Sequence, residues 1–190
     1  MPSSTLLLER ISTLIQQTLR DEAARHGLLP VQLQVLHYLA RANRYSDLPI
    51  AIAEYLGVTR GTVSQTLAVL TRKGLLARHP QGRRIHLHLT PAGTAVVQQG
   101  WTSQLETVLD ETGNAAMQTG LQHLLRALQH LNQQQAFGIC HQCQHFLKEQ
   151  DGHRCGLTGE VLEDEQIVRL CREWRQADGA DRVRPAKWAP

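Results

Sequence analysis

The stretch LPIAIAEYLGVTRGTVSQTLAVLTRKG, residues 48–74, decides the fold of this chain. Its apolar residues recur at helical spacing and predict a short helix over 48–56 with a longer helix after it. Gly57-Val58 makes a tight turn between the two helices, Thr59 caps the second helix, and Gly74 ends it. A short helix, a turn with glycine and a helix with a polar, basic outer face are typical of a helix-turn-helix.

The residues after this stretch change from a helical to an alternating pattern. Residues 75–78 are expected to form one strand, and 85–89 alternate apolar with polar residues as a half-buried strand does. Between them, 79–84 is predicted to be a turn that carries Arg83 and Arg84 at its tip. A short hairpin with arginines at its tip, directly behind a helix-turn-helix, is typical of a wing that contacts phosphates or the minor groove.

Further helices flank this core. One is expected from a cap at Ser3, Ser4 or Thr5 to about His26, and another begins at Pro30. Beyond the wing, Thr90-Pro91 opens a helix that Gly113-Asn114 interrupts, and a leucine-rich helix follows over about 115–135. Because these helices carry more leucine than the small core needs, we expect two copies of the chain to associate through them. The predicted fold class is mainly α with a small β-wing.

Basic charge is concentrated in one part of the chain. No Asp or Glu occurs from Tyr55 to Leu105, whereas that segment contains six Lys or Arg. The rest of the chain has 20 − 6 = 14 basic residues against 17 acidic ones. This asymmetry indicates a polyanion-binding site, with an ordinary solvated basic face as the alternative.

The predicted DNA contacts lie on the second helix of the helix-turn-helix and on the wing. Val63, Leu67 and Leu70 are expected to pack inward, which leaves the other faces of the N-terminal half for the major groove. Gln65 could form paired hydrogen bonds with adenine, and Arg60 could bind guanine or a phosphate. The complete predicted set is Thr59, Arg60, Thr62, Ser64, Gln65, Thr66, Arg83 and Arg84.

Residues from about 6 to 131 resemble a MarR-family winged helix-turn-helix regulator. The matching stretches, in chain order, are GLLPVQ (27–32), IAEYLGV (52–58), TRGTVS (59–64), KGLL (73–76) and LTPAG (89–93). The resemblance implies a homodimer joined through terminal helices that binds a pseudo-palindromic double-stranded DNA operator in adjacent major grooves. One departure is Gln81, where the family commonly has an acidic residue two positions before the wing arginine that matches Arg83. The family's usual small-molecule pocket is not recognisable, and no enzyme motif occurs.

All four cysteines lie in the last third of the chain, as Cys140-x2-Cys143-x11-Cys155-x15-Cys171. The chain shows no secretory leader and no apolar run as long as a membrane span, so we expect a cytoplasmic protein. Thiols stay reduced in that compartment, and four of them in one short segment favour a metal centre over disulfides.

The type of metal centre stays open between two possibilities. Zinc accepts four thiolates, but zinc modules usually pair two short Cys-x2-Cys turns, and this spacing is wider. An iron–sulfur cluster tolerates scattered ligands shielded by apolar residues, and we favour it. Cys155 is expected in a flexible loop, and Cys171 on the inner face of a final helix that begins with Glu163-Asp164-Glu165. Thiol oxidation at Cys140 and Cys143 is a further alternative.

These observations predict three regions. Residues 1–135 are expected to hold the winged helix-turn-helix and dimerisation helices, with the DNA-binding core at about 30–93. Residues 136–175 would form the metal module, and 176–190 a disordered tail. The predicted function is a dimeric DNA-binding transcriptional regulator whose cluster senses redox or iron status. Loss of the cluster would reorder the module behind the dimer helices and change the distance between recognition helices.

Overall fold

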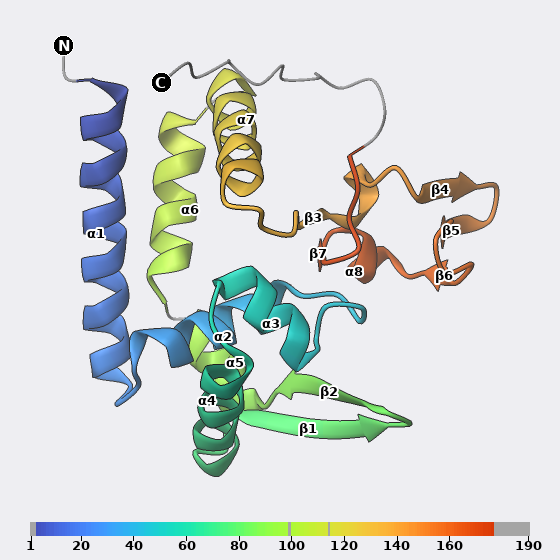
Figure 1. Cartoon of the computed structure of the whole chain (residues 1–190), viewed down its shortest axis with the longest axis horizontal. Helices are drawn as coiled ribbons and strands as arrows, with labels where there is room; N and C mark the ends of the chain where they lie inside the picture. The colour runs from blue at the N-terminus through green and yellow to red at the C-terminus, as the bar shows by residue number, and fades with distance from the viewer. Residues whose placement is uncertain (1–2, 99, 114, 177–190) are drawn as a thin grey trace. The chain divides into compact units, whose positions relative to one another are not determined.

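The computed structural model describes residues 3–98, 100–113 and 115–176 (Figure 1). The expected tail at 177–190 lies outside the described residues. The chain divides into two compact units, of which one contains residues 1–40 and 58–112. The other contains residues 41–57 together with the chain from residue 113 onward. The cysteine segment therefore shares a unit with the first helix of the helix-turn-helix, which the sequence places in a different region.

The first unit begins with the two helices that the sequence predicts. α1 spans Ser4–Arg25 and is capped by Ser3, whose hydroxyl accepts a hydrogen bond from the Leu6 N–H at 3.3 Å. Gly27, with φ of 61°, follows the end of this helix, and α2 spans Pro30–Arg41. The core of the unit is built from buried residues of α2, α4 and the hairpin, which include Leu33, Val35, Leu36, Val63, Leu67, Leu70, Leu76 and Leu87.

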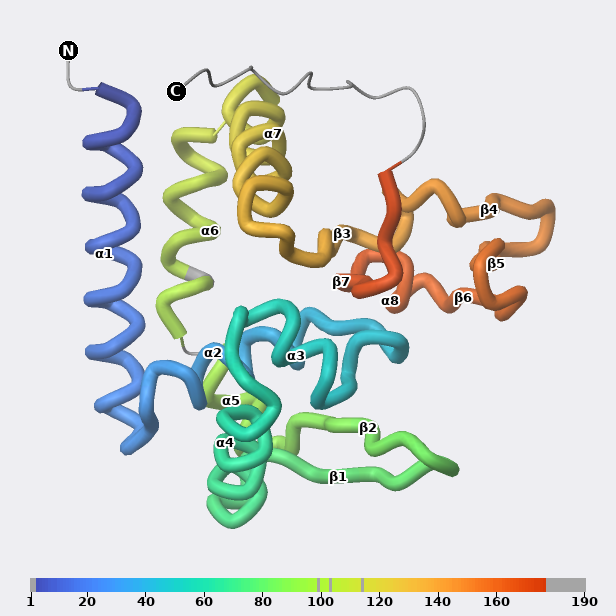
Figure 2. The backbone as a smooth tube through the Cα atoms, viewed as in Figure 1, coloured from blue at the N-terminus to red at the C-terminus, as the bar shows by residue number. Residues whose placement is uncertain are grey.

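The recognition helix and the wing follow one another in this unit. α4 spans Arg60–Arg72, and the Thr59 hydroxyl caps it by accepting a hydrogen bond from the Thr62 N–H at 3.1 Å. The hairpin consists of β1, Leu76–Gln81, and β2, Arg84–Leu89, in the antiparallel register Leu76↔Leu89 to Gln81↔Arg84. Figure 2 traces α4 into this hairpin.

The wing is longer than the sequence indicates. Strand β1 continues through His79 and Pro80 to Gln81, so the predicted six-residue turn shrinks to Gly82 and Arg83. Gly82 has φ of 59°, a conformation that glycine adopts without steric cost and that suits a two-residue hairpin loop. Pro80 fits into this strand because a two-stranded ribbon has open edges that require no donor there.

The helix predicted to start at Thr90-Pro91 is broken into two. α5 spans Pro91–Gln98 and α6 spans Trp101–Thr112. Glu22 of α1 is buried at the break, where its carboxylate accepts a hydrogen bond from the Trp101 N–H at 2.7 Å. A Cβ at Gly100 would lie 2.5 Å from a Glu22 carboxylate oxygen. The helix is therefore broken where Gly100 lies close to Glu22, a residue far away in the sequence. The local pattern of apolar residues does not reveal such a contact.

The second unit contains α3, α7 and the cysteine module. α3 spans Pro49–Leu56 and ends at Gly57, whose φ is 64°, and α7 spans Ala115–Leu131. The module has one two-stranded sheet, in which β3 (Gly138–Ile139) pairs with β7 (Leu170–Cys171). Its other sheet has the order β4-β5-β6, with bounds Phe146–Glu149, Gly152–Cys155 and Val161–Leu162. Two short helical turns, η1 (Cys140–Gln142) and α8 (Asp164–Ile167), complete it.

Two local predictions for the module are wrong. The final helix ends after one turn at Ile167, and Cys171 instead lies in β7, where it is paired with Gly138. Cys155 ends strand β5 and does not lie in a flexible loop. Cys171 is placed by pairing with the distant strand β3, whereas Cys155 lies in a local hairpin, where it pairs with Phe146 of β4.

Among the described helices, none combines the length and hydropathy needed to cross a membrane.

Candidate DNA-binding surface and metal centre

The N-terminal half of α4 presents a polar face to solvent. Thr59, Arg60, Ser64 and Gln65 are exposed, and Thr62 is half-buried. The hydroxyls of Thr59 and Thr62 lie 2.9 Å apart, so both belong to the helix cap. Arg60, Ser64 and Gln65 are thus the side chains of this face that extend freely from the helix.

Thr66 does not belong to this face, which corrects the sequence prediction. It is 5% exposed, beside Leu67 at 2%. The reason is helical spacing, because residue 66 follows buried Val63 by three positions and precedes buried Leu70 by four. Its side chain points into the core and is unavailable to a DNA groove.

The wing adds two exposed cations close together. Arg83 occupies the two-residue turn and Arg84 is the first residue of β2. Both side chains are exposed, as is Arg78 on the facing strand. Because the sequence from Tyr55 to Leu105 contains no acidic residue, no carboxylate of that segment neutralises these cations. Such a surface attracts a phosphate backbone.

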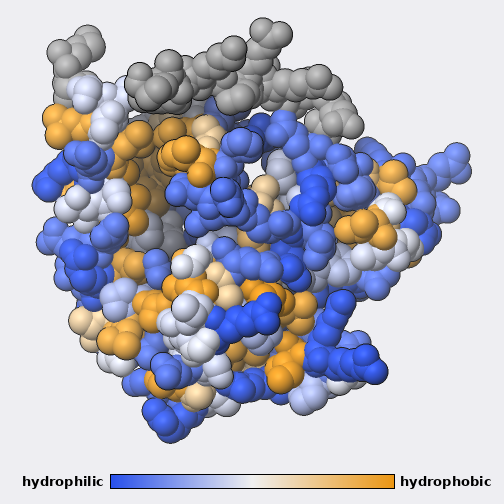
Figure 3. Space-filling model, viewed as in Figure 1, coloured by the Kyte–Doolittle hydropathy of each residue, from blue (hydrophilic) through white to orange (hydrophobic). Residues whose placement is uncertain are grey.

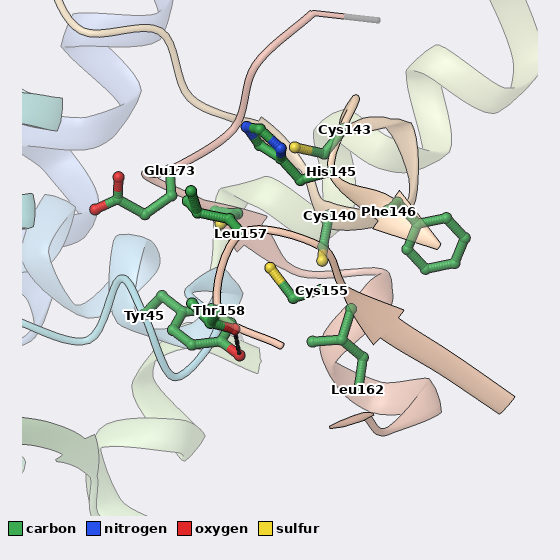
Figure 4. Close-up of a pocket in the computed structure, with 11 residues that line it drawn as sticks. Tyr45, Cys140, Cys143, His145, Phe146, Cys155, Leu157, Thr158, Leu162 and Glu173 are labelled. Carbon is green, nitrogen blue, oxygen red and sulfur yellow. Dashed lines mark hydrogen bonds between the residues drawn. The ribbon is translucent and has the colours of Figure 1, made fainter. Parts of the chain in front are cut away.

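The four cysteines surround one cavity in the second unit (Figure 4). Cys140 and Cys143 flank the η1 turn, where the Cys143 N–H donates to the Cys140 carbonyl at 3.1 Å. Cys155 ends β5, Cys171 ends β7, and Figure 4 shows the sulfurs of Cys140 and Cys155 pointing into the same space. The remaining lining residues are Tyr45, His145, Phe146, Leu157, Thr158, Leu162 and Glu173.

The protonation of the cysteines reflects their mutual proximity. Burial raises the pKa of Cys140 to about 12, and the nearby thiols of Cys171, Cys155 and Cys143 add to the increase. Burial also raises the pKa of Cys171, although the Asn43 side chain partly counteracts it. Four thiolates gathered here therefore require a cation, which metal binding would supply as the thiols release their protons.

Hydrogen-bond donors lie around the cysteine cavity. The Arg175 N–H donates to the Cys143 sulfur at 3.4 Å. The side-chain nitrogens of Asn43 and Trp174 are buried, and the Trp174 nitrogen has no acceptor among the described residues. Trp174 packs in the same cluster as the cysteines, and Asn43 acts on Cys171. Buried donors of this kind match the acceptor capacity of metal-bound thiolates or sulfides.

The cysteines do not converge on one point. Within the described residues, no three His, Cys, Asp or Glu side chains are close enough together to hold a single metal ion. The cysteines instead line a shared cavity whose other walls include Phe146, Leu157 and Leu162.

Of the three nearby histidines, only His145 lines the cavity. The His141 ring nitrogen lies 3.0 Å from the Ile167 carbonyl oxygen. His153 lies 3.5 Å from the Asp164 carboxylate and stacks on the Phe146 ring. His141 and His153 are therefore not among the residues that line the cavity.

Sequence reasoning missed the contribution of the α2–α3 connection to this cavity. The Tyr45 hydroxyl donates to a Glu160 carboxylate oxygen at 2.6 Å, and burial together with that hydrogen bond raises the pKa of Tyr45. The Arg44 guanidinium donates to the Val161 carbonyl at 2.7 Å. No local pattern connects these residues to the cysteines, because the contacts join segments far apart in the sequence.

Comparison with known proteins agrees with the architecture of the DNA-binding region. The MarR family model matches residues 26–85. The crystal structure of the MepR–DNA complex from Staphylococcus aureus is 26% identical, covers 68% of this chain and 100% of its own, and gives a TM-score of 0.53. The crystal structure of MepR, a transcription regulator of the Staphylococcus aureus multidrug efflux pump MepA, is also 26% identical. The match covers 67% of this chain and 100% of MepR, with a TM-score of 0.51.

The chain is therefore similar to MarR-family proteins over residues 26–85. The proteins of the MarR family are DNA-binding transcription regulators and not enzymes. The MarR-family match ends before residue 136, so it does not extend to the cysteine module. No curated protein matches the chain.

Proposed function

We propose that this protein is a homodimeric transcriptional regulator that binds a pseudo-palindromic operator through α4 and the wing. We further propose that its four cysteines hold an iron–sulfur cluster whose state controls this binding. The DNA-binding part rests chiefly on one observation: a MarR-family domain exposes a polar α4 face and an arginine wing within an acid-free segment. MepR, at 26% identity, has been crystallised with DNA.

Within this function the exposed residues take different parts. Gln65 has two hydrogen-bonding groups that match the major-groove edge of adenine, and Arg60 matches guanine or a phosphate. Arg83 and Arg84 on the wing supply affinity that depends little on sequence. The N-terminus of α4 directs free N–H groups toward phosphate, as helix N-termini do.

Dimerisation is supported by apolar side chains that the single chain leaves in water (Figure 3). On α1, Leu6, Leu7 and Ile11 are 54%, 50% and 52% exposed. On α7, Leu121, Leu125 and Leu131 are 50%, 53% and 75% exposed. Apolar stripes of this size on soluble chains are typical of protein interfaces, and a second copy would cover them symmetrically.

The cluster is supported by the donor set. Cys140, Cys143, Cys155 and Cys171 would be its ligands, and the Asn43 and Trp174 N–H groups would donate to its sulfur atoms. Phe146, Leu157 and Leu162 would shield it from water. When bound, such a cluster supplies a redox-active centre that oxygen or iron shortage removes.

A structural zinc site is the second candidate, and the η1 turn favours it. The short Cys140–Cys143 turn, closed by a hydrogen bond from the Cys143 N–H, places two thiolates side by side as zinc-binding turns do. In that case the module would be held together by zinc, and another ligand or thiol oxidation would control the DNA-binding domain.

The test begins with a random pool of double-stranded DNA, from which the metal-loaded protein selects binding sites without oxygen. A pseudo-palindromic consensus is expected, with half-sites about one helical turn apart. Affinity for this consensus is then measured for the metal-loaded and the chelator-treated protein. Absence of any enriched sequence would refute the DNA-binding proposal, and equal affinity of the two forms would refute control by the metal centre.

A further inference from the structure

The segment between α2 and α3 is attached to the strand that carries Cys171. Ala42 forms a parallel bridge with Leu170, and the Asn43 N–H donates to the Leu170 carbonyl at 2.9 Å. The Arg44 N–H donates to the Gln166 side chain at 3.0 Å. The residue immediately before Cys171 is therefore fixed to this connection by its backbone.

The residue immediately after Cys171 is fixed to the same connection and to α3. The Arg172 N–H donates to the Ser46 hydroxyl at 2.8 Å, and that hydroxyl donates to the Asn43 side-chain oxygen at 2.8 Å. Ser46 and Asn43 are 0% and 1% exposed, so water does not compete for these bonds. The Arg172 guanidinium lies 2.9 Å from a carboxylate oxygen of Glu54, which is on α3.

The same connection closes one side of the cysteine cavity. Tyr45 lines the cavity with the four cysteines, and Figure 4 shows its ring beside Thr158. Its hydroxyl and the Arg44 guanidinium both contact the Glu160 carboxylate, at 2.6 and 2.9 Å. A rearrangement of the loop after Cys155 would therefore displace the residues that lead into α3.

α3 is joined to the recognition helix by only three residues. Gly57 closes α3 with φ of 64°, its N–H donates to the Ala53 carbonyl, and Thr59 is already the cap of α4. Because so few residues separate the two helices, a shift or rotation of α3 would also displace Thr59, the cap of α4. Helix shifts of this kind are a known form of switching.

We infer that the state of the cysteine site is transmitted to the DNA-binding surface through the buried Asn43–Ser46–Arg172 hydrogen bonds and the Arg172–Glu54 ion pair. This inference rests on the proposed function. It places the transmission in α3, whereas the sequence led us to expect it in the dimer helices. α7 also contacts the module, where the Arg126 guanidinium lies 5.8 Å from the centre of the Trp174 ring. That contact does not involve Leu170 or Arg172, the two neighbours of Cys171. A displacement of the Cys171 side chain would move these two residues first.

The experiment compares operator affinity with and without the metal centre in four proteins. They are the wild type, Arg172→Gln, Glu54→Gln and the matched control Lys148→Gln. Lys148 is an exposed residue of β4, so the control removes a cation of the same module away from α3 and from the loop after Cys155. The probe is the selected duplex, and metal content and visible spectrum are recorded for each protein.

The wild type and Lys148→Gln should change their dissociation constant by about tenfold or more between the two states, which is within the usual range of coupling between sites. Arg172→Gln and Glu54→Gln should retain metal and reduce this ratio to less than about twofold. Full coupling in both variants would overturn the inference and point to α7 instead. If the wild type bound the duplex equally well in both states, control by the metal centre and this inference would both be refuted. Loss of metal from folded Glu54→Gln would contradict the inference, because the ion pair would then hold the cysteine site together and would not only transmit its state.

Discussion

The guanidinium of Arg172 lies 2.9 Å from the carboxylate of Glu54. The first residue follows a cysteine of the cysteine module, and the second lies on the first helix of the helix-turn-helix. The two side chains are 23% and 30% exposed, so the pair is partly shielded from water. The cysteine module therefore contacts α3 of the helix-turn-helix directly through this ion pair.

Replacement of Gln65 by Ala should relax the preference for one base in each half-site at a cost of about 1–3 kcal/mol. The physical reason is the loss of two hydrogen bonds to a base edge. Competition between the consensus duplex and duplexes altered at single positions measures this effect. Thr66→Val is the matched control, because Thr66 is buried, and a large loss of DNA affinity in that variant would contradict the assignment of the helix face.

Replacement of Arg83 or Arg84 by Gln should weaken binding to all duplexes to a similar degree. Each wing arginine that contacts phosphate releases counterions, so each variant should lower the slope of log affinity against log salt by about one unit. Titrations over a range of salt concentrations give the slope. Arg10→Gln, an exposed substitution on α1, should leave the slope unchanged. A changed base preference in the wing variants would show that the wing reads sequence.

Leu125→Asp on α7 should convert the dimer into a monomer. A carboxylate in a leucine interface lacks a partner and is costly to bury. Because a monomer binds only one half-site, the affinity for the full operator should fall by about a hundredfold or more. Sedimentation and DNA titration measure the two effects. Thr119→Asp, on the opposite side of the same helix, should remain dimeric, and a dimeric Leu125→Asp would place the interface elsewhere.

Metal-free protein should lose stability as the pH rises above about 9. The pKa of Cys140 is raised from 9.0 to about 12, so the folded state retains a proton that the unfolded state has already released. The contribution to the free energy of unfolding is therefore complete below pH 9 and decreases between pH 9 and 12. Urea unfolding of reduced wild type and Cys140→Ser at pH 8 and 10 measures it. An equal decrease in both proteins would exclude Cys140 as the cause.

The sequence was sufficient for elements whose signals are local. Thr59, Gly57 and Gly74 define the ends of α3 and α4, and these ends agree with the structure. Local signals did not reveal the break at Gly100, which depends on Glu22, or the position of Cys171 in β7, which depends on pairing with Gly138. These features follow from tertiary contacts.

The candidate site shows the same limit. The cysteine spacing predicted that the four thiols gather, and they line one cavity. The residues that tie this cavity to α3, namely Asn43, Tyr45 and Ser46, carry no motif, because their role comes from the segment that packs against them. Thr66 was misassigned because its polarity suggested exposure, whereas its position in α4 places it among buried residues.

The most direct test of the central claim is the absorbance spectrum of protein purified without oxygen, together with iron, acid-labile sulfide and zinc analysis. Broad visible absorption with iron and sulfide should be present in the wild type and in His141→Ala, and should be lost when any of the four cysteines is replaced by Ser. A colourless wild-type protein with one zinc per chain would contradict the iron–sulfur cluster and assign the module a structural role.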